Sequence, residues 1–286
     1  MSNPTFCEAL TWGSKHLKDM PTALALRQTE ELLAHVCSCS RFNLYRSIDK
    51  PLSNVKWEKF QEQIRRREEH VPLQHLLGEV DFYGSTLEVN ADVLIPRLET
   101  EELCGHVIDA YQMNPPKRVL DLCTGSGALA IVMAKQWPEA EVWATDVSLA
   151  ALHMAEHNAK KNGCDTHMHF RLGDLWSAVE GQFDLIVSNP PYIARADIQN
   201  LPKEVKDYDP HLALDGGSDG LDFYCRIFSD VHQYLKPLGY LYLEMGETQG
   251  DDLCQMAKNK NFLKCKILKD LNKKERFCVL YGFDKN

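Results

Sequence analysis

Strand-length apolar runs alternate with helical segments from Lys117 to the end of the chain. Strands are expected at residues 118–123, 141–147, 167–174, 183–188, 240–245, 264–270 and 276–283. Helices are expected at residues 128–137, 150–162, 220–235 and 248–258. Since the last two strands have no helix between them, they should form an antiparallel pair at the sheet edge. The pattern therefore predicts an α/β fold with a doubly wound, seven-stranded Rossmann-like sheet.

The fourth expected strand runs into a stiff turn, Asn189-Pro190-Pro191-Tyr192. The carboxyl edge of an open α/β sheet is where ligands bind. A residue before proline is pushed toward extended backbone, and a proline keeps its carbonyl but has no N–H. The turn thus offers the Asn189 oxygen, the Pro190 carbonyl and the Tyr192 ring, which suit a flat group carrying an NH2, either an amide or an amino-substituted base. The alternative is a plain strand-ending turn, because Asn-Pro is a common turn dipeptide.

A glycine-containing turn, Cys123–Gly127, follows the first strand of this sheet. Glycine permits positive φ and close approach of a ligand to the backbone. Asp146 ends the next strand, where a carboxylate can accept hydrogen bonds from both ribose hydroxyls of a nucleoside. The turn does not fit NAD, because Ala130 and Cys123 occupy two of the glycine positions of G-x-G-x-x-G. Asp174-Leu175 ends the third strand and should lie beside an adenine ring.

Residues 1–78 read as a small helical bundle. One helix should begin after Pro21, and another should have Ser53 as its N-cap. The apolar positions of the two helices repeat at intervals of three and four residues: Leu26, Thr29, Leu33 and Val36, then Trp57, Phe60 and Ile64.

Residues 79–96 are expected to be a β-hairpin linker. Val80–Tyr83 and Thr86–Val89 form two short strand patterns around Gly84-Ser85. The second domain then spans residues 97–286 and should begin with a helix that runs toward Tyr111.

Charge is unevenly distributed. Residues 1–80 hold 11 Lys/Arg and 10 Asp/Glu, whereas residues 81–286 hold 21 and 31. A nucleic-acid-binding protein usually carries a basic face, so no direct nucleic-acid partner is expected. The only dense basic run, Arg65–Arg67, is followed at once by Glu68-Glu69 and fits a solvated helix face.

Cysteine spacing and hydropathy indicate the cellular compartment of the protein. The ten cysteines contain no CxxC pair, so neither a metal site nor a redox dithiol is expected. No apolar run is long enough to span a bilayer, and the N-terminal residues resemble no targeting signal. We expect a cytoplasmic protein with reduced thiols and no membrane partner.

Several motifs together resemble a known family. VLDLCTGSGALA, ATDVS, GDLW and VSNPPY are similar to the class I methyltransferases that use S-adenosylmethionine. More narrowly, PLQHLLGEVDFYG (72–84), LIPRLETEEL (94–103), NPPYI and LALDGGSDGLDFY (212–224) resemble the PrmC/HemK family, the bacterial glutamine methyltransferases of peptide chain release factors. The resemblance covers nearly the whole chain.

This resemblance implies transfer of a methyl group from S-adenosylmethionine to the side-chain amide nitrogen (N5) of the glutamine in a release factor's Gly-Gly-Gln loop. We expect the chain to be a monomer, and we expect the near-neutral N-terminal helical domain, residues 1–78, to recognise the release factor. The implied cofactor contacts are Asp121, Cys123, Thr124, Gly125, Ser126, Gly127, Asp146, Asp174, Leu175 and Asn189. The implied substrate contacts are Asn189, Pro190, Pro191, Tyr192 and Arg97, of which Asn189, Pro190 and Tyr192 are the expected catalytic residues.

The chain departs from the family pattern at a few positions. Cys123 replaces the usual first glycine of the turn, and Leu98 stands where a second proline is common. Asn272-Lys273 replaces a glycine-containing turn before Arg276.

Three alternatives remain open at this point. An amino-group methyltransferase of DNA or rRNA could hold an extruded base in the same turn, although the acidic second half opposes it. A glutamine methyltransferase of a large-subunit ribosomal protein usually has Ser-Pro-Ile-Ala-Glu after Ile-Pro-Arg, unlike Leu98-Glu99-Thr100. A regulator that binds the cofactor without catalysis leaves the intact Asn-Pro-Pro-Tyr motif unexplained.

Overall fold

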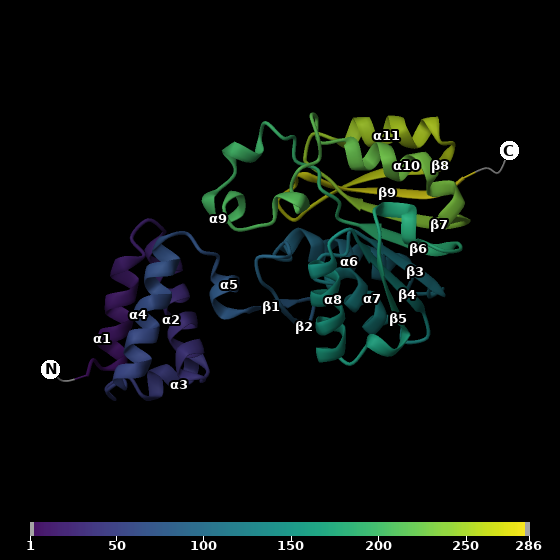
Figure 1. Cartoon of the computed structure of the whole chain (residues 1–286). Helices are drawn as coiled ribbons and strands as arrows, with labels where there is room; N and C mark the ends of the chain where they lie inside the picture. Colours follow the sequence, from purple (N-terminus) through teal and green to yellow (C-terminus); the bar gives the residue numbers. More distant parts are fainter. Residues whose placement is uncertain (1–2, 284–286) are drawn as a thin grey trace. The chain divides into compact units, whose positions relative to one another are not determined.

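A computed structural model describes residues 3–283 of the chain (Figure 1). It divides into two compact units. The first contains the residues up to Gly78 together with Pro202–Tyr208, and the second contains Glu79–Leu201 and the residues from Asp209 onward.

The first unit is helical, as the sequence predicted. Its helices are α1 (Phe6–His16), α2 (Thr22–Cys37), α3 (Arg41–Arg46), α4 (Asn54–Glu68), α5 (Leu73–Leu77) and α9 (Lys203–Lys206). Helix α1 begins with a capping box, since Thr5 Oγ1 accepts from the Glu8 N–H and the Glu8 carboxylate accepts from the Thr5 N–H. Ser53 caps α4, which confirms that expectation.

The segment Pro202–Tyr208 is held in the first unit by two contacts. The Arg67 guanidinium, whose side chain is 3% exposed, pairs with the Glu204 carboxylate at 2.6 Å. The Tyr208 hydroxyl donates to the Glu69 carbonyl at 2.8 Å. The first unit is therefore built from two stretches of chain that are far apart in the sequence.

The expected hairpin is present, but its turn lies one residue earlier than predicted. Strands β1 (Glu79–Phe82) and β2 (Ser85–Glu88) flank Tyr83-Gly84 rather than Gly84-Ser85. Tyr83 and Gly84 have φ of 46° and 74°, the two positive values that a two-residue hairpin turn needs to match the strand twist. The prediction placed the turn on the small residues and missed a tyrosine in left-handed conformation.

The second unit is built on the predicted seven-stranded sheet. Its strands are β3 (Arg118–Leu122), β4 (Glu141–Asp146), β5 (Met168–Leu172), β6 (Phe183–Ser188), β7 (Leu235–Glu244), β8 (Phe262–Lys269) and β9 (Glu275–Phe283). The strand order is β5-β4-β3-β6-β7-β9-β8. All neighbours are parallel except β9, which is antiparallel to both β7 and β8, so the expected antiparallel closure is confirmed.

Helices cover both faces of this sheet (Figure 1). The helices α6 (Leu98–Ala110), α7 (Ala128–Gln136) and α8 (Leu149–Lys161) pack on one face, and α10 (Asp222–Tyr234) and α11 (Gly250–Asn259) on the other. Short 3₁₀ turns lie at Asp165–His167, Leu175–Ala178, Ile198–Asn200 and His211–Ala213. Strand order reverses between β3 and β6, and a doubly wound sheet opens a crevice at such a point.

Candidate functional site

A cavity lies at the carboxyl ends of β3, β4 and β6 and measures about 1020 Å³ including its open mouth. It collects most of the residues that the sequence singled out. The predicted residues that line it are Asp121, Cys123, Thr124, Gly125, Ser126, Asp146, Asp174, Leu175, Asn189 and Pro191. Gly127, Pro190, Tyr192 and Arg97 are not among its lining residues.

The Cys123–Gly127 turn is fastened to the next strand. The Thr124 N–H donates to the Thr145 carbonyl at 2.9 Å, and the Gly127 N–H donates to the Thr124 carbonyl at 2.9 Å. Cys123 has φ of 61°, a left-handed conformation that glycine adopts at lower cost. Burial raises the pKa of the Cys123 thiol, with further increases from the nearby Asp146 and Asp121 charges, so this cysteine is not a reactive thiolate.

The two glycines of the turn do different things. Gly125 has φ of 55°, and a Cβ built on it would meet no atom within 4 Å, so the space above it is open to a ligand. Gly127 has φ of 84°, and its Cβ would lie 3.0 Å from the Ala155 Cβ. Gly127 therefore lets α7 begin close against α8, which explains why it lies outside the cavity lining.

Asp121 stabilises the turn through its carboxylate. Its side chain is almost completely buried, and its Oδ2 accepts from the Thr124 hydroxyl at 2.6 Å and from the Ala130 N–H at 3.1 Å. Burial raises the Asp121 pKa to about 7, although these two hydrogen bonds act in the opposite direction. Asp121 thus joins the end of β3 to the turn and to the first residues of α7.

Asp146 presents a carboxylate that is already oriented. Its Oδ2 accepts from the Gly125 N–H and its Oδ1 from the Ser148 N–H, both at 2.9 Å. Burial raises the pKa of Asp146, while these main-chain donors lower it. Each oxygen keeps further lone pairs for a ligand, so Asp146 can accept hydrogen bonds from a diol in a fixed geometry.

A buried amide that the sequence analysis missed ties this turn to the hairpin. Asn158, completely buried on α8, donates from Nδ2 to the Ser126 carbonyl at 2.9 Å and to the Glu88 carbonyl at 3.0 Å. Its Oδ1 accepts from the Glu88 N–H at 2.7 Å. Asn158 therefore pairs with the strand backbone as another strand would, while it holds the glycine turn.

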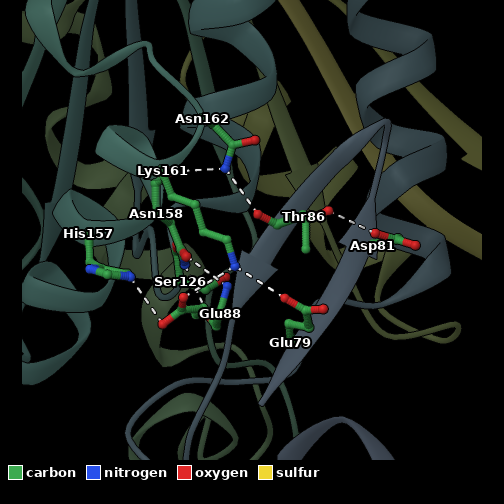
Figure 2. A network of polar contacts seen from close by, with 9 residues as sticks. All are labelled: Glu79, Asp81, Thr86, Glu88, Ser126, His157, Asn158, Lys161 and Asn162. Atoms are coloured by element: carbon green, nitrogen blue, oxygen red, sulfur yellow. Dashed lines mark hydrogen bonds and ion pairs between the residues drawn. The ribbon is translucent and has the colours of Figure 1, made fainter. Parts of the chain in front are cut away.

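Charged side chains reinforce this contact at the surface. Figure 2 shows Lys161 between Glu79 and Glu88, at 3.2 Å from an oxygen of each, and His157 beside Glu88. Asn162 donates to the Thr86 carbonyl in the same view. Both strands of the hairpin are thus bound to α8.

Asp174 and Leu175 follow β5 and line the cavity. The Asp174 Oδ2 pairs with Arg226 at 2.7 Å, which leaves its other oxygen available. Leu175 is buried and has φ of 49°. An apolar side chain next to a carboxylate can receive the face and the amino edge of a purine.

The backbone of the Asn-Pro-Pro-Tyr turn is held by a glycine-rich loop. Ile193 N–H donates to the Leu214 carbonyl at 3.1 Å, and Gly216 N–H donates to the Ile193 carbonyl at 2.8 Å. A Cβ on Gly216 would lie 2.8 Å from the Tyr192 Cα, so only glycine allows this approach. Gln249, at the start of α11, donates to the Tyr192 carbonyl at 3.0 Å.

The side chains of the turn reach two residues that sequence reasoning missed. Asn189 Nδ2 donates to the Thr100 hydroxyl at 3.2 Å, and the Tyr192 hydroxyl donates to Glu244 at 3.2 Å. Thr100 lies in the motif 94–103 but had no role assigned to it. Glu244 carries one sequence signal, since it is an acidic residue directly after the run Leu241-Tyr242-Leu243.

Arg97 is engaged away from the cavity. Its guanidinium pairs with the buried Asp209 carboxylate. Asp209 precedes Pro210, which lines the cavity, so this pair anchors one wall.

Neither a metal cluster nor a membrane span is found within residues 3–283. No group of three or more His, Cys, Asp or Glu side chains in that range is arranged to hold a metal ion. No helix in the described part of the chain has the length and apolar character needed to cross a membrane.

Two family models match parts of this chain. The family described as Methyltransferase small domain matches residues 91–206, and the PrmC N-terminal domain matches residues 8–78. Among solved structures, the hMettl16 catalytic domain in complex with a MAT2A 3′UTR hairpin has a TM-score of 0.58 at 14% identity and covers 82% of this chain and 84% of its own. At that identity the likeness shows the methyltransferase fold alone.

Curated relatives are more specific. A release factor glutamine methyltransferase of Geobacter sulfurreducens is 38% identical over 270 residues, with 94% of this chain and 93% of the relative covered. One from Bacillus subtilis is 34% identical over 285 residues, with 96% and 98% covered. From this identity along almost the full length, the chain belongs to the release factor glutamine methyltransferase family.

Proposed function

We propose that this chain transfers a methyl group from S-adenosylmethionine to the N5 nitrogen of the glutamine in the Gly-Gly-Gln loop of a peptide chain release factor. One observation carries the proposal: Asn189 and Pro191 line the same cavity as Asp146 and the glycine turn. A methyl donor and a flat amide can therefore meet within one enclosure.

The cavity residues fit the proposed cofactor. Asp146 would accept the ribose hydroxyls, and the open space above Gly125 leaves room for the methionine part against the turn. Asp174 and Leu175 would receive the adenine amino group and ring. The cofactor supplies an electrophilic methyl group when it is bound.

The chain's own residues would orient the nucleophile. An amide nitrogen is a poor nucleophile because its lone pair is delocalised, so catalysis depends on holding it in line at attack distance. The Asn189 oxygen and the Pro190 carbonyl would each accept one amide proton and stabilise the positive charge that develops on nitrogen. The amide proton can leave after transfer, so no initial base is required.

Tyr192 and Pro191 would form the walls around the flat amide. The Tyr192 hydroxyl is bound to Glu244 and its carbonyl to Gln249, so the ring is the part of Tyr192 left for the substrate. Arg97 is a further proposed substrate contact, because its side chain remains 36% exposed after it pairs with Asp209.

The helical unit would recognise the protein part of the substrate. Its near-neutral charge suits a protein partner rather than nucleic acid. Phe42 and Val55 are 71% and 75% exposed, and exposed apolar side chains often anchor partners.

Phe42→Ser and Val55→Ser should raise KM for the release factor without changing cofactor affinity. An unchanged KM in both variants would count against this role. The enzyme is proposed to act as a cytoplasmic monomer.

The decisive test uses labelled S-adenosylmethionine, purified enzyme and a release factor. Mass spectrometry should place one added methyl group on the glutamine of Gly-Gly-Gln, and a release factor with that glutamine replaced by alanine should stay unlabelled. Label on a ribosomal protein or on nucleic acid instead would contradict the substrate assignment.

Variants of Asn189 test the chemistry. Asn189→Ala removes one oriented hydrogen bond, which typically costs about 10²–10³ in kcat. Asn189→Asp keeps an acceptor and should lie between alanine and wild type in single-turnover rate. Cofactor affinity should change less than the rate in both.

A further inference from the structure

Glu244 is a buried carboxyl group directly behind the Asn-Pro-Pro-Tyr turn. It is the last residue of β7, and only 1% of it is exposed. The Thr100 hydroxyl donates to its Oε2 at 2.7 Å, and the Tyr192 hydroxyl donates to its Oε1 at 3.2 Å. Each carboxylate oxygen thus receives a hydrogen bond from a different side chain.

Thr100 connects this carboxylate to Asn189. A hydroxyl has one proton to donate, and an ionised carboxylate can only accept. Because the Thr100 proton is directed to Glu244, Thr100 Oγ1 can only accept from Asn189, and this fixes the NH2 end of the Asn189 amide at 3.2 Å from it. The Asn189 oxygen must then lie on the other side of the amide. Within residues 3–283 no hydrogen bond to that oxygen is present.

We propose that Glu244 is a positioning residue for methyl transfer. Through the Thr100 hydroxyl it sets which end of the Asn189 amide faces the substrate, and through the Tyr192 hydroxyl it holds the ring that walls the substrate amide. The inference rests on the proposed function, in which the Asn189 oxygen accepts a proton of the reacting amide.

The protonation state of Glu244 decides whether this arrangement holds. Burial raises its pKa to about 7, and the Glu99 charge acts in the same direction, whereas the Thr100 and Tyr192 hydrogen bonds and the Arg276 charge lower it. The titratable and charged groups that face Glu244 from the surrounding elements are Glu99, Cys104, Tyr192, Tyr224 and Arg276.

Protonation would reverse the direction of the hydrogen-bond chain. A carboxylic acid can donate to the Thr100 oxygen, which frees the Thr100 proton for the Asn189 oxygen and allows the amide to turn over. The ionised form of Glu244 is therefore the active one. The single-turnover rate should rise with pH through a limb near neutrality.

Three variants separate this role from simple packing. Thr100→Ser keeps the hydroxyl and loses a methyl group, whereas Thr100→Val keeps the shape and loses the hydroxyl. Glu244→Gln keeps the shape but can accept only one of the two hydrogen bonds at its single oxygen. Outer-shell partners that orient metal ligands typically contribute about 10–100-fold to affinity or activity, and we expect a partner that orients Asn189 to act on the same scale. Thr100→Val and Glu244→Gln should slow single-turnover methylation of the release factor by about this factor, and Thr100→Ser should stay close to wild type. Cofactor Kd should change less than the rate in all three, although Thr100 lines the cavity.

The pH profile gives a readout that packing does not move. The neutral-pH limb of the wild-type rate should disappear in Glu244→Gln. An equal rate for Thr100→Val and Thr100→Ser, or a wild-type pH limb in Glu244→Gln, overturns the proposal. If Glu244→Gln does not fold, the two Thr100 variants decide the matter by themselves.

Double variants distinguish this inference from the function on which it rests. Glu244→Gln should add less to the loss caused by Asn189→Ala than it costs in the wild type, because only its contact with Tyr192 is then left to act on the substrate. If Asn189→Ala itself reacts at the wild-type rate, the role of Asn189 fails and the positioning role with it. If Asn189→Ala is slow while Thr100→Val and Glu244→Gln match wild type, only the positioning role is wrong.

Discussion

The side-chain amide of Asn158 donates a 2.9 Å hydrogen bond to the main-chain carbonyl of Ser126, so α8 holds the glycine turn of the cavity. The same amide pairs with both the N–H and the carbonyl of Glu88 in the hairpin. One buried residue therefore makes the geometry of the turn depend on the position of β2. We expect cofactor affinity to respond to changes in the hairpin contact.

Replacing Asn158 should weaken both folding and cofactor binding. Asn158→Ala leaves the Ser126 carbonyl and the two Glu88 backbone groups without this partner, and a buried unsatisfied polar group costs about 1–3 kcal/mol. Urea denaturation should show a loss of stability in this range or above, and calorimetry should show a larger cofactor Kd. The neighbouring His157 is the control, because its side chain is 55% exposed and its ion pair with Glu88 lies at the surface. A comparable loss in His157→Ala would contradict a specific role for Asn158.

Alanine at Gly125 and at Gly127 should have different consequences. Both have positive φ, so either substitution carries a backbone cost of about 1–2 kcal/mol. At Gly127 the new Cβ also meets Ala155, and such crowding adds about 1–3 kcal/mol. Gly127→Ala should therefore lose more stability. Gly125→Ala should keep most of its stability and lose more cofactor affinity, because its methyl group enters the open cavity.

For each of the two variants, denaturation measures the free energy of unfolding and calorimetry measures the cofactor Kd. Equal stability losses would show that the Ala155 contact relaxes without cost. Unchanged cofactor affinity in Gly125→Ala would place the ligand away from the turn.

Cys123 should be replaceable by glycine at little cost. Its left-handed φ of 61° is strained for any residue with a Cβ, so Cys123→Gly relieves about 1–2 kcal/mol while it loses the side-chain packing and gains freedom in the unfolded chain. We expect the variant to stay within about 1 kcal/mol of wild type by denaturation. A β-branched residue is worse than cysteine here, so Cys123→Val should be clearly destabilised. If valine and glycine are tolerated equally, backbone strain at this position is negligible.

Stability and activity should respond to pH in opposite directions. The pKa values of Asp121 and Glu244 are raised to about 7 by burial, from ordinary values of 3.8 and 4.5. Between those ordinary values and pH 7 the folded protein retains protons that the unfolded chain releases, so the contribution of both groups to stability falls as pH rises. The ionised Glu244 is meanwhile the form proposed to be active.

Denaturation at pH 5 and pH 8 without cofactor tests this sign. Asp121→Asn and Glu244→Gln should each gain stability relative to wild type on going from pH 5 to pH 8, because each has lost one of the two carboxyl groups that must ionise in the interior. A relative loss over the same interval would contradict the raised pKa values.

Most of the sheet was predictable because its strands carry the information locally. Leu185–Val187 is an apolar run typical of a strand buried on both faces of a parallel sheet, and the turns after β3 and β6 contain their own glycines and prolines. Strand order then brings these turns together without any further sequence signal. The predicted position of the hairpin turn was wrong by one residue, because the left-handed conformation of Tyr83 is imposed by strand twist and not by residue type.

The supporting side chains were not predictable for a different reason. Thr100 and Glu244 are separated by 144 residues, and Asn158 and Glu88 by 70. No local period or spacing connects such residues, so only the fold reveals that their donors and acceptors match. Arg97 gives a second example. Its motif predicts a contact with the substrate, but the motif does not reveal that the guanidinium pairs with Asp209, 112 residues later in the chain.

Because the helical unit consists of two separate stretches of chain, truncation at a single position cannot separate it intact from the second unit. A gene fragment ending at Gly78 omits Glu204 and Tyr208, which leaves the buried Arg67 without its carboxylate and the Glu69 carbonyl without its donor. Conversely, a fragment that begins at Glu79 still carries Pro202–Tyr208 in the middle of the remaining chain, with none of the helices it packs with. The helical unit therefore cannot be exchanged between relatives as one continuous segment. A chimera must exchange the residues up to Gly78 and the segment Pro202–Tyr208 together.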